Sequence, residues 1–282
     1  MNRLRITHKT GFTYGGDATA SYNEARMLPV SFDGQLVIAS HLDISPVNAH
    51  HNYVDYWGTR VASFEILTPH RELSITANSV VEVRPRPLPR ETISWAELAD
   101  ATDDTTATVE QLAETRLTAP PEEVAALARE IAGRSPDPMA AAFDICLAIG
   151  DAVEYVQGVT GVHSSAADAW DHRKGVCQDI AHLAIGALRS VGIPARYVSG
   201  YLHPKPDAEI GETVAGESHA WVEWYAGPGW HGFDPTNSIE IGDRHVHVGR
   251  GRDYNDVPPL RGVYAGPFGS KLFVTVEITR EA

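Results

Sequence analysis

The chain has 282 residues, of which 43% are hydrophobic and 21% are charged. This composition excludes a chain that is disordered throughout, and the 24 glycines and 18 prolines show no three-residue period, which excludes a collagen. The formal net charge of −14 repels phosphate groups and anionic lipid surfaces. We therefore expect neither a nucleic acid nor a membrane as a partner.

The two cysteines, Cys146 and Cys177, are too few for a disulfide framework. The first residues alternate between apolar and polar types, and no segment has the apolar run of a signal peptide or a membrane span. We therefore expect a cytoplasmic protein, in which thiols stay reduced. A cysteine in such a protein is more interesting for its chemistry than as half of a disulfide.

Short segments of alternating apolar and polar residues dominate the first third of the chain. They cover residues 4–8, 35–45, 61–67 and 73–83, with turn residues between them. Several short strands at this spacing are typical of packed antiparallel sheets. The sequence therefore predicts an N-terminal antiparallel β-sandwich-like domain over residues 1–84.

Residues 85–120 read as a connector. The segment begins with several prolines, which favour an extended chain, and continues with a polar, low-complexity stretch. Short helical pieces are expected at residues 95–98 and 109–117, and they can dock on either neighbouring domain.

From residue 121 onward the apolar residues recur with a helical period. One helix is predicted over 121–133, and a second begins at Asp137 and Pro138, with Cys146 on its apolar face. A third helix is predicted over 176–191. Strand-like segments follow at 196–201, 219–224, 230–233 and 272–278. This order predicts an α+β domain over residues 121–282.

Cys177 stands at the opening of the third predicted helix, directly after Gly175 and Val176. A helix N-terminus offers free N–H groups and a partial positive charge, and both stabilise a thiolate. Cys146, in contrast, is expected to pack in the core as a small apolar residue. The position of Cys177 therefore makes it a candidate nucleophile.

A thiol nucleophile needs a base, and the base needs a group that orients it. His219 opens a predicted strand 42 residues after Cys177, and Asp234 follows 15 residues later. Two strands joined by a turn at residues 227–229 would place His219 and Asp234 on adjacent strands. The order Cys, His, Asp is therefore workable on one helix and one hairpin.

Four segments in this region carry a resemblance to a known family. GVCQDIAHL, IPARYVSGYL, HAWVEWY and GWHGFDPTN resemble the core motifs of the transglutaminase-like superfamily, in the bacterial branch described as transglutaminase-like cysteine proteases. The β-rich N-terminal region resembles the domain that such proteins carry. The resemblance implies a papain-like core with a nucleophile helix packed on an antiparallel sheet. It places the nucleophile on Cys177, the base on His219 and the orienting acid on Asp234.

Other polar residues near these motifs have weaker assignments. The backbone N–H of Cys177 is the natural first oxyanion donor, and Tyr155 is a weak candidate for the second. Papain-like proteases place a glutamine six residues before the nucleophile, but Asp171 stands there in this chain. His245 and His247 can be drawn with Cys177 as a zinc site, but the spacing matches no ligand motif, so we expect no metal and no cofactor.

We expect a cysteine-dependent amide-bond enzyme that forms a thioester with a peptide or protein substrate and hydrolyses peptide or isopeptide bonds. Transfer of the acyl group to an amine, as in a protein-glutamine gamma-glutamyltransferase, is the alternative. Glu217, Glu223 and nearby tryptophans could contribute an amine pocket for it. A third possibility is a catalytically silent peptide-binding or protein-binding module of the same fold. The oligomeric state is not predicted.

Overall fold

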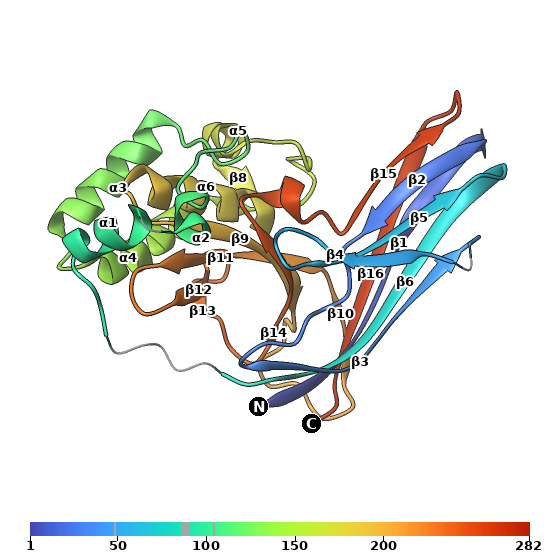
Figure 1. The fold of residues 1–282 in the computed structure, drawn as a ribbon, viewed down its shortest axis with the longest axis horizontal. Helices are drawn as coiled ribbons and strands as arrows, with labels where there is room; N and C mark the ends of the chain where they lie inside the picture. The colour runs from blue at the N-terminus through green and yellow to red at the C-terminus, as the bar shows by residue number, and fades with distance from the viewer. Residues whose placement is uncertain (48, 86–90, 104) are drawn as a thin grey trace.

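The computed structural model describes residues 1–47, 49–85, 91–103 and 105–282. Helices gather on one side of a central sheet, and long strands extend away from its other side (Figure 1). Both termini lie together at the base of the long strands (Figure 1). The antiparallel sheets and the separate group of helices confirm the predicted α+β class.

The long strands form two antiparallel sheets. The first has the order β10-β16-β1-β6-β3 and comprises β1 (Asn2–Ala18), β3 (Gln35–Ser45), β6 (His70–Val83), β10 (Thr213–Gly216) and β16 (Ser270–Arg280). The second has the order β15-β2-β5-β4 and comprises β2 (Ala20–Ala25), β4 (His51–Val54), β5 (Arg60–Ile66) and β15 (Leu260–Ala265). Tyr14 and Leu73 of the first sheet and Phe64 of the second belong to one buried apolar cluster. The two sheets therefore pack face to face, which confirms the sandwich-like arrangement.

Three of these strands come from the C-terminal half of the chain. β16 pairs with β1 along most of its length, as in the pair Ile6 and Ile278, while β10 extends the same sheet and β15 pairs with β2. The expected division into 1–84, 85–120 and 121–282 placed all three in the α+β domain over 121–282. Strand pairing instead joins them to the N-terminal sheets, because alternation predicts a strand but not its partner.

The central sheet is also antiparallel, with the order β13-β12-β11-β9-β14. Its strands are β9 (Ala195–Leu202), β11 (Ser218–Tyr225), β12 (Trp230–Asp234), β13 (Ile239–Glu240) and β14 (His245–Gly251). Leu4, Val81 and Ile278 of the first sheet share a buried cluster with Tyr201 and Val246 of the central sheet. The N-terminal region is therefore packed directly against the sheet that carries the predicted base and acid.

Helices cover the central sheet on the side of β9 and β11. They are α1 (Trp95–Asp103), α2 (Thr106–Val109), α3 (Glu122–Arg134), α4 (Pro138–Ala152), α5 (Ala166–His172) and α6 (Cys177–Ser190). A two-stranded parallel pair, β7 (Glu154–Tyr155) and β8 (Lys174–Gly175), precedes α6, and a 3₁₀ turn, η1 (Tyr254–Asp256), follows β14. In the described part of the chain, no helix has both the length and the apolar character needed to cross a membrane.

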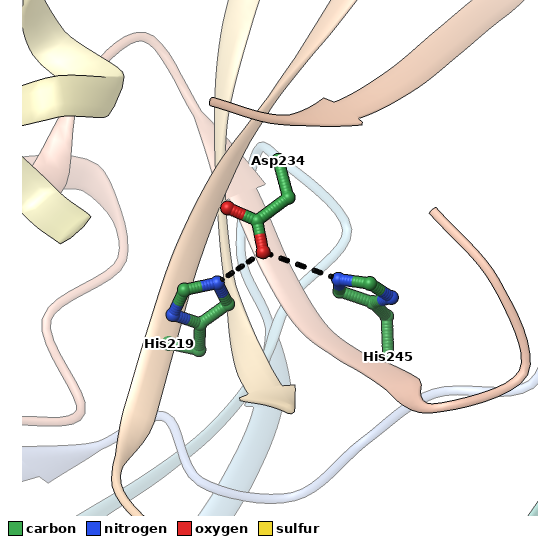
Figure 2. Close-up of side chains that lie close together, drawn as sticks. All are labelled: His219, Asp234 and His245. Carbon is green, nitrogen blue, oxygen red and sulfur yellow. Dashed lines mark hydrogen bonds and ion pairs between the residues drawn. The ribbon is translucent and has the colours of Figure 1, made fainter. Parts of the chain in front are cut away.

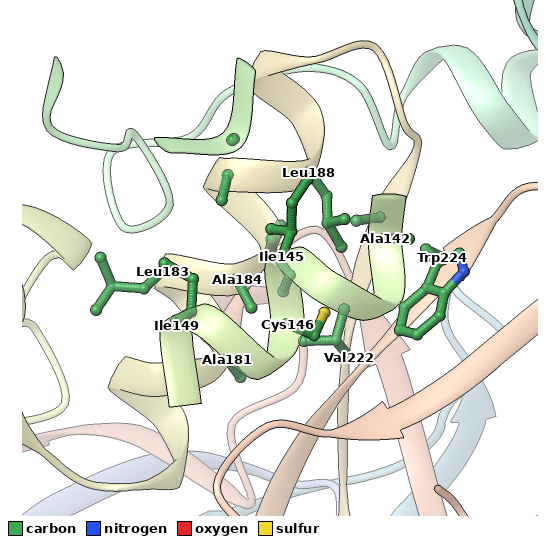
Figure 3. Packing of buried hydrophobic residues seen from close by; sticks show 14 of the residues in the cluster. Ala142, Ile145, Cys146, Ile149, Ala181, Leu183, Ala184, Leu188, Val222 and Trp224 are labelled. Carbon is green, nitrogen blue, oxygen red and sulfur yellow. The ribbon is translucent and has the colours of Figure 1, made fainter. Parts of the chain in front are cut away.

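The core under these helices centres on α6, whose residues from Gln178 to Arg189 are all buried. Figure 3 shows α4 packed across α6, with Cys146 among apolar side chains of both helices and close to Val222 and Trp224. Cys146 has no exposed surface, and burial raises the pKa of its thiol above the ordinary range. The prediction that Cys146 is a core residue is confirmed.

The predicted connector docks on α6. The expected helix at 95–98 lies within α1, but a helix over 109–117 was wrong, since α2 ends at Val109. The buried Arg189 guanidinium instead donates to the carbonyls of Gln111, at 2.8 Å, and Ala113, at 2.9 Å. The Gln111 carbonyl also accepts the Ala195 N–H at 3.1 Å, so this segment makes long-range contacts where the helix was expected. Residues 86–90 and 104 of the connector lie outside the described residues.

Candidate active site

The nucleophile candidate is the first residue of α6. Val176 precedes it in an extended conformation, and the Asp179 Oδ2 accepts hydrogen bonds from the Val176 N–H at 2.8 Å and from Thr160 Oγ1 at 2.6 Å. A side chain at Gly175 would place its Cβ 2.8 Å from the Cβ of Asp179. This tight turn leaves Cys177 half-buried at the positive end of the helix, as predicted.

The predicted base and acid meet on neighbouring strands. β11 and β12 pair as a hairpin, and the His219 Nε2 donates to the Asp234 Oδ2 at 2.7 Å. Figure 2 shows the two side chains facing one another, with the other ring nitrogen of His219 pointing away from Asp234. The Asp234 side chain has no exposed surface, and that of His219 is 10% exposed. The hairpin geometry inferred from their 15-residue spacing is thus present.

Cys177 lies close enough to His219 to affect the pKa of its ring. Burial alone lowers the pKa of His219, but its hydrogen bonds to Asp234 and Cys177, together with their negative charges, raise that pKa to about 10. Because Nε2 is bonded to Asp234, the Cys177 contact falls to Nδ1. The arrangement therefore favours an imidazolium at His219, beside the Asp234 carboxylate.

Both carboxylate oxygens of Asp234 accept hydrogen bonds from the residues that follow it. Oδ1 accepts the backbone N–H groups of Thr236, at 3.1 Å, and Asn237, at 3.2 Å, while Oδ2 also accepts the Asn237 side-chain amide at 2.7 Å. Burial raises the pKa of Asp234, but the hydrogen bonds from His219 and the other donors outweigh it and hold this pKa well below its usual range. The turn after Asp234 packs against α4, where a Cβ at Gly150 would lie 2.2 Å from the Pro235 carbonyl oxygen.

One residue of this network, His245, was not expected from the sequence to contact Asp234. The His245 Nε2 lies 3.4 Å from the Asp234 Oδ2, on the side away from His219 (Figure 2). His247, which the hypothetical zinc site grouped with it, bonds through its backbone to the Gln35 side chain. No local signal pointed to the contact, because Asp234 ends β12 and His245 begins β14, two strands that do not pair.

The donor atoms of His219, Asp234 and His245 all lie within 4.8 Å of one another, as in a metal site. The protonation of His245 argues against such a role. Its Nδ1 accepts the backbone N–H of Gly242 at 3.2 Å, so the neutral ring carries its proton on Nε2, the atom that faces Asp234. A nitrogen with a bound proton has no lone pair for a metal, and these contacts fit a hydrogen-bond network.

Tyr155 lies beside the nucleophile turn, because it pairs with Gly175 between β7 and β8. Burial and the negative charge of Cys177 raise the pKa of Tyr155. Its hydroxyl donates to the Glu217 Oε2 at 3.4 Å, and Gln157 Nε2 donates to the other oxygen of Glu217 at 2.6 Å. The hydroxyl is therefore engaged with Glu217 here, and its role as an oxyanion donor stays a prediction.

Glu223 does not lie with Tyr155 and Glu217 beside the nucleophile turn. It is buried, and its Oε2 accepts the Arg196 Nε at 2.7 Å. Burial raises the pKa of Glu223, but the charge of Arg196 and other nearby cations lowers it to about 2. Of the two acids considered for an amine pocket, Glu217 is exposed, whereas Glu223 is buried and paired with Arg196.

His182, five residues after Cys177, is fully buried on α6. Its Nε2 accepts the Tyr254 N–H at 3.2 Å, which fastens η1 to the helix. The Arg252 carbonyl accepts from the Arg189 Nη2 at 2.8 Å. His182 and the segment around Tyr254 thus have structural roles.

Two family models match the chain. The model of the transglutaminase-like superfamily matches residues 125–235, and that of the bacterial transglutaminase-like N-terminal region matches residues 4–82. The first includes Cys177, His219 and Asp234, and the second covers most of the N-terminal strands.

Individual proteins are also similar to this chain in sequence or in structure. An uncharacterized protein of Mycobacterium leprae is 45% identical over 287 residues, covering 100% of both chains. A protein-glutamine gamma-glutamyltransferase of Pseudomonas aeruginosa is 36% identical over 104 residues, which are 33% of this chain and 15% of that protein. The crystal structure of a "putative cysteine protease" from Cytophaga hutchinsonii has a TM-score of 0.78 and 22% identity, and the match covers 100% of this chain and 92% of that one. The last likeness shows that the whole chain shares a fold with that structure.

Proposed function

The chain belongs to the transglutaminase-like superfamily, and we propose that it is a cysteine-dependent enzyme that hydrolyses peptide or isopeptide bonds. The observation that carries the proposal is the hydrogen bond from His219 to the buried Asp234, with Cys177 at the start of α6 close enough to raise the pKa of His219. A module that only binds peptides has no need for a thiol, an imidazole and a buried carboxylate in this order.

In the proposed reaction, His219 takes the thiol proton of Cys177, and the thiolate attacks the amide carbonyl carbon. A carbon–sulfur bond forms, and the carbonyl oxygen becomes an oxyanion near the N–H groups at the start of α6. His219 then gives its proton to the leaving amine as the carbon–nitrogen bond breaks. Asp234 keeps the Nε2 proton of His219 in place, so that Nδ1 serves both proton transfers.

The resulting thioester is resolved by water, activated by His219. Transfer to an amine shares every step up to this point, so the difference lies in how the acceptor is held. An amine competes with water at about 55 M only if the protein positions it, and positioning supplies an effective molarity of up to about 10⁵ M or more. Glu223 is already paired with Arg196, which supports hydrolysis over transfer.

Amine transfer is the second candidate. The matching segment of the Pseudomonas aeruginosa protein-glutamine gamma-glutamyltransferase favours it, and the exposed Glu217 offers one carboxylate near Tyr155. A silent peptide-binding module is the third. We further propose a peptide or protein substrate and a cytoplasmic location, and no role for a nucleic acid or membrane.

The test offers the full-length protein a peptide library, and separately a glutamine-containing peptide with excess labelled cadaverine. Mass spectrometry distinguishes cleavage, deamidation and stable amine incorporation. The Cys177→Ala variant must lose the activity, whereas Cys146→Ala, which keeps the candidate nucleophile, must retain it. Amine incorporation above hydrolysis would favour transfer. No product from any substrate, together with peptide binding, would favour the silent module.

A further inference from the structure

We propose that His245 is a positioning residue that acts through Asp234: its N–H draws charge away from the Asp234 Oδ2 and so limits how tightly His219 holds its proton. This inference rests on the proposed roles of Cys177, His219 and Asp234. His245 itself would touch neither the substrate nor the thiol.

The hydrogen bonds of His245 fix its role as a donor. Its side chain is 1% exposed, and its Nδ1 accepts the Gly242 N–H at 3.2 Å. A backbone N–H can only donate, so Nδ1 has no proton and Nε2 must carry one. That Nε2–H is 3.4 Å from the Asp234 Oδ2. Burial also lowers the pKa of His245, which keeps the ring neutral.

Packing keeps the ring in this position. The Trp221 ring meets the His245 ring edge-on, with 5.4 Å between centroids. Two residues along β14, the buried Gln35 side chain donates to the His247 carbonyl and accepts its N–H, each at 2.8 Å. β14 is an edge strand of the central sheet, so the amide of Gln35 takes the place of a neighbouring strand. The N-terminal region therefore braces the strand that presents His245.

His245 affects the basicity of His219 because both rings donate to the same oxygen of Asp234. Oδ2 of Asp234 accepts from His219, Asn237 and His245 together. Each donor stabilises the carboxylate and weakens its attraction for the other protons. Without the N–H of His245, Asp234 would bind the His219 imidazolium more tightly. A more basic His219 gives its proton less readily to a leaving amine.

Other charged groups around His245 do not reproduce this effect. Arg244, His219 and Asp234 act on it electrostatically, and Glu223, His231 and His247 line the same small cavity of about 140 Å³. Glu223 stays ionised beside Arg196, and burial lowers the pKa of His231. Among the neighbours in the described part of the chain, only His219 and Asn237 share Oδ2 with His245.

The test is the pH dependence of Cys177 alkylation by iodoacetate in the full chain. The anionic reagent is attracted by the His219 imidazolium, so the rate falls when that proton is lost. His245→Leu removes the donor, and His245→Gln keeps an N–H of similar reach. In His245→Leu, we expect the pH at which the alkylation rate falls on the alkaline side to rise by about half a pH unit or more. In His245→Gln, this pH should return toward the wild-type value. An unchanged pH, a downward shift, or equal behaviour of both variants would refute the proposal.

A measurement on the wild-type protein covers the case in which a variant does not fold. Imidazole ¹⁵N NMR must show His245 as the neutral Nε2–H tautomer at neutral pH. A protonated ring or an Nδ1–H tautomer at neutral pH would overturn the inference. The result does not depend on thiol reactivity, so it is distinguishable from a failure of the proposed function, which would appear as wild-type Cys177 that does not react.

Discussion

Replacing Asp234 with asparagine tests the orientation of the proposed base. Oδ1 of Asp234 accepts two backbone N–H groups, from Thr236 and Asn237, so the oxygen of the new amide must stay there. Its NH₂ group then takes the place of Oδ2 and faces the N–H donors of His219, Asn237 and His245. The Asp234→Asn protein therefore contains donors pointing at donors.

His219 can relieve this conflict and His245 cannot. His219 can shift its proton to Nδ1 and accept from the new amide, but Nδ1 is then no longer free to take the Cys177 proton. The Nδ1 of His245 is held by the Gly242 N–H. In a serine-protease triad, the same aspartate-to-asparagine change lowers kcat by about 10⁴-fold through the wrong tautomer. We expect a loss of similar order here.

The Asp234→Asn change should affect the stability of the fold much less than it affects kcat. A buried donor left without an acceptor costs about 1–3 kcal/mol of the free energy of unfolding, which corresponds to several degrees in the thermal midpoint. The variant should therefore still be folded at room temperature. Circular dichroism measures this, and turnover of a peptide found in the library measures the activity.

A matched control is Asp137→Asn, the same chemical change at the N-cap of α4. The Asp137 Oδ1 accepts the Ala140 N–H at 2.8 Å, and asparagine caps a helix about as well as aspartate. This control should keep wild-type activity. Turnover of Asp234→Asn within tenfold of wild type, which is far less than the loss of about 10⁴-fold expected, would remove Asp234 from the mechanism.

Four further outcomes are expected. Iodoacetamide should label Cys177 much faster than Cys146 at neutral pH, because burial keeps Cys146 protonated and enclosed; peptide mapping by mass spectrometry checks this, and equal labelling would contradict it. Cys177→Ala should abolish activity but shift the thermal midpoint by only a few degrees, since alanine fits a helix start; a large shift would indicate a packing role. The pKa of His219 is raised to about 10, so kcat/KM should persist above neutral pH and fall as pH rises through about 10; a fall near 6.5, the ordinary histidine value, would show that the imidazolium is not stabilised. Gly150→Ala should lower both stability and turnover, because its Cβ would lie 2.2 Å from the Pro235 carbonyl oxygen and displace the turn after the acid; unchanged turnover would contradict this reasoning.

The local features of the fold were predictable from neighbouring residues. The apolar period, Asp137 with Pro138, and Gly175 before Cys177 fixed where α4 and α6 begin, because a helix start depends on the few residues around it. The spacing of His219 and Asp234 predicted adjacent strands, since a hairpin is also a local structure. The resemblance then assigned roles to these residues, which the alkylation and substitution experiments are designed to test.

The tertiary structure decided what depended on distant partners. Alternation predicted that residues 272–278 form a strand but not that β16 pairs with β1, because a strand's pattern specifies a buried face and not the neighbouring backbone. His245 had no visible relation to Asp234, since the contact requires β12 to end where the edge strand β14 begins. Glu223 looked available for a substrate amine, but folding buries it beside Arg196. Sequence periodicity determines which residues turn inward, whereas only the order and packing of the strands determines which of them meet.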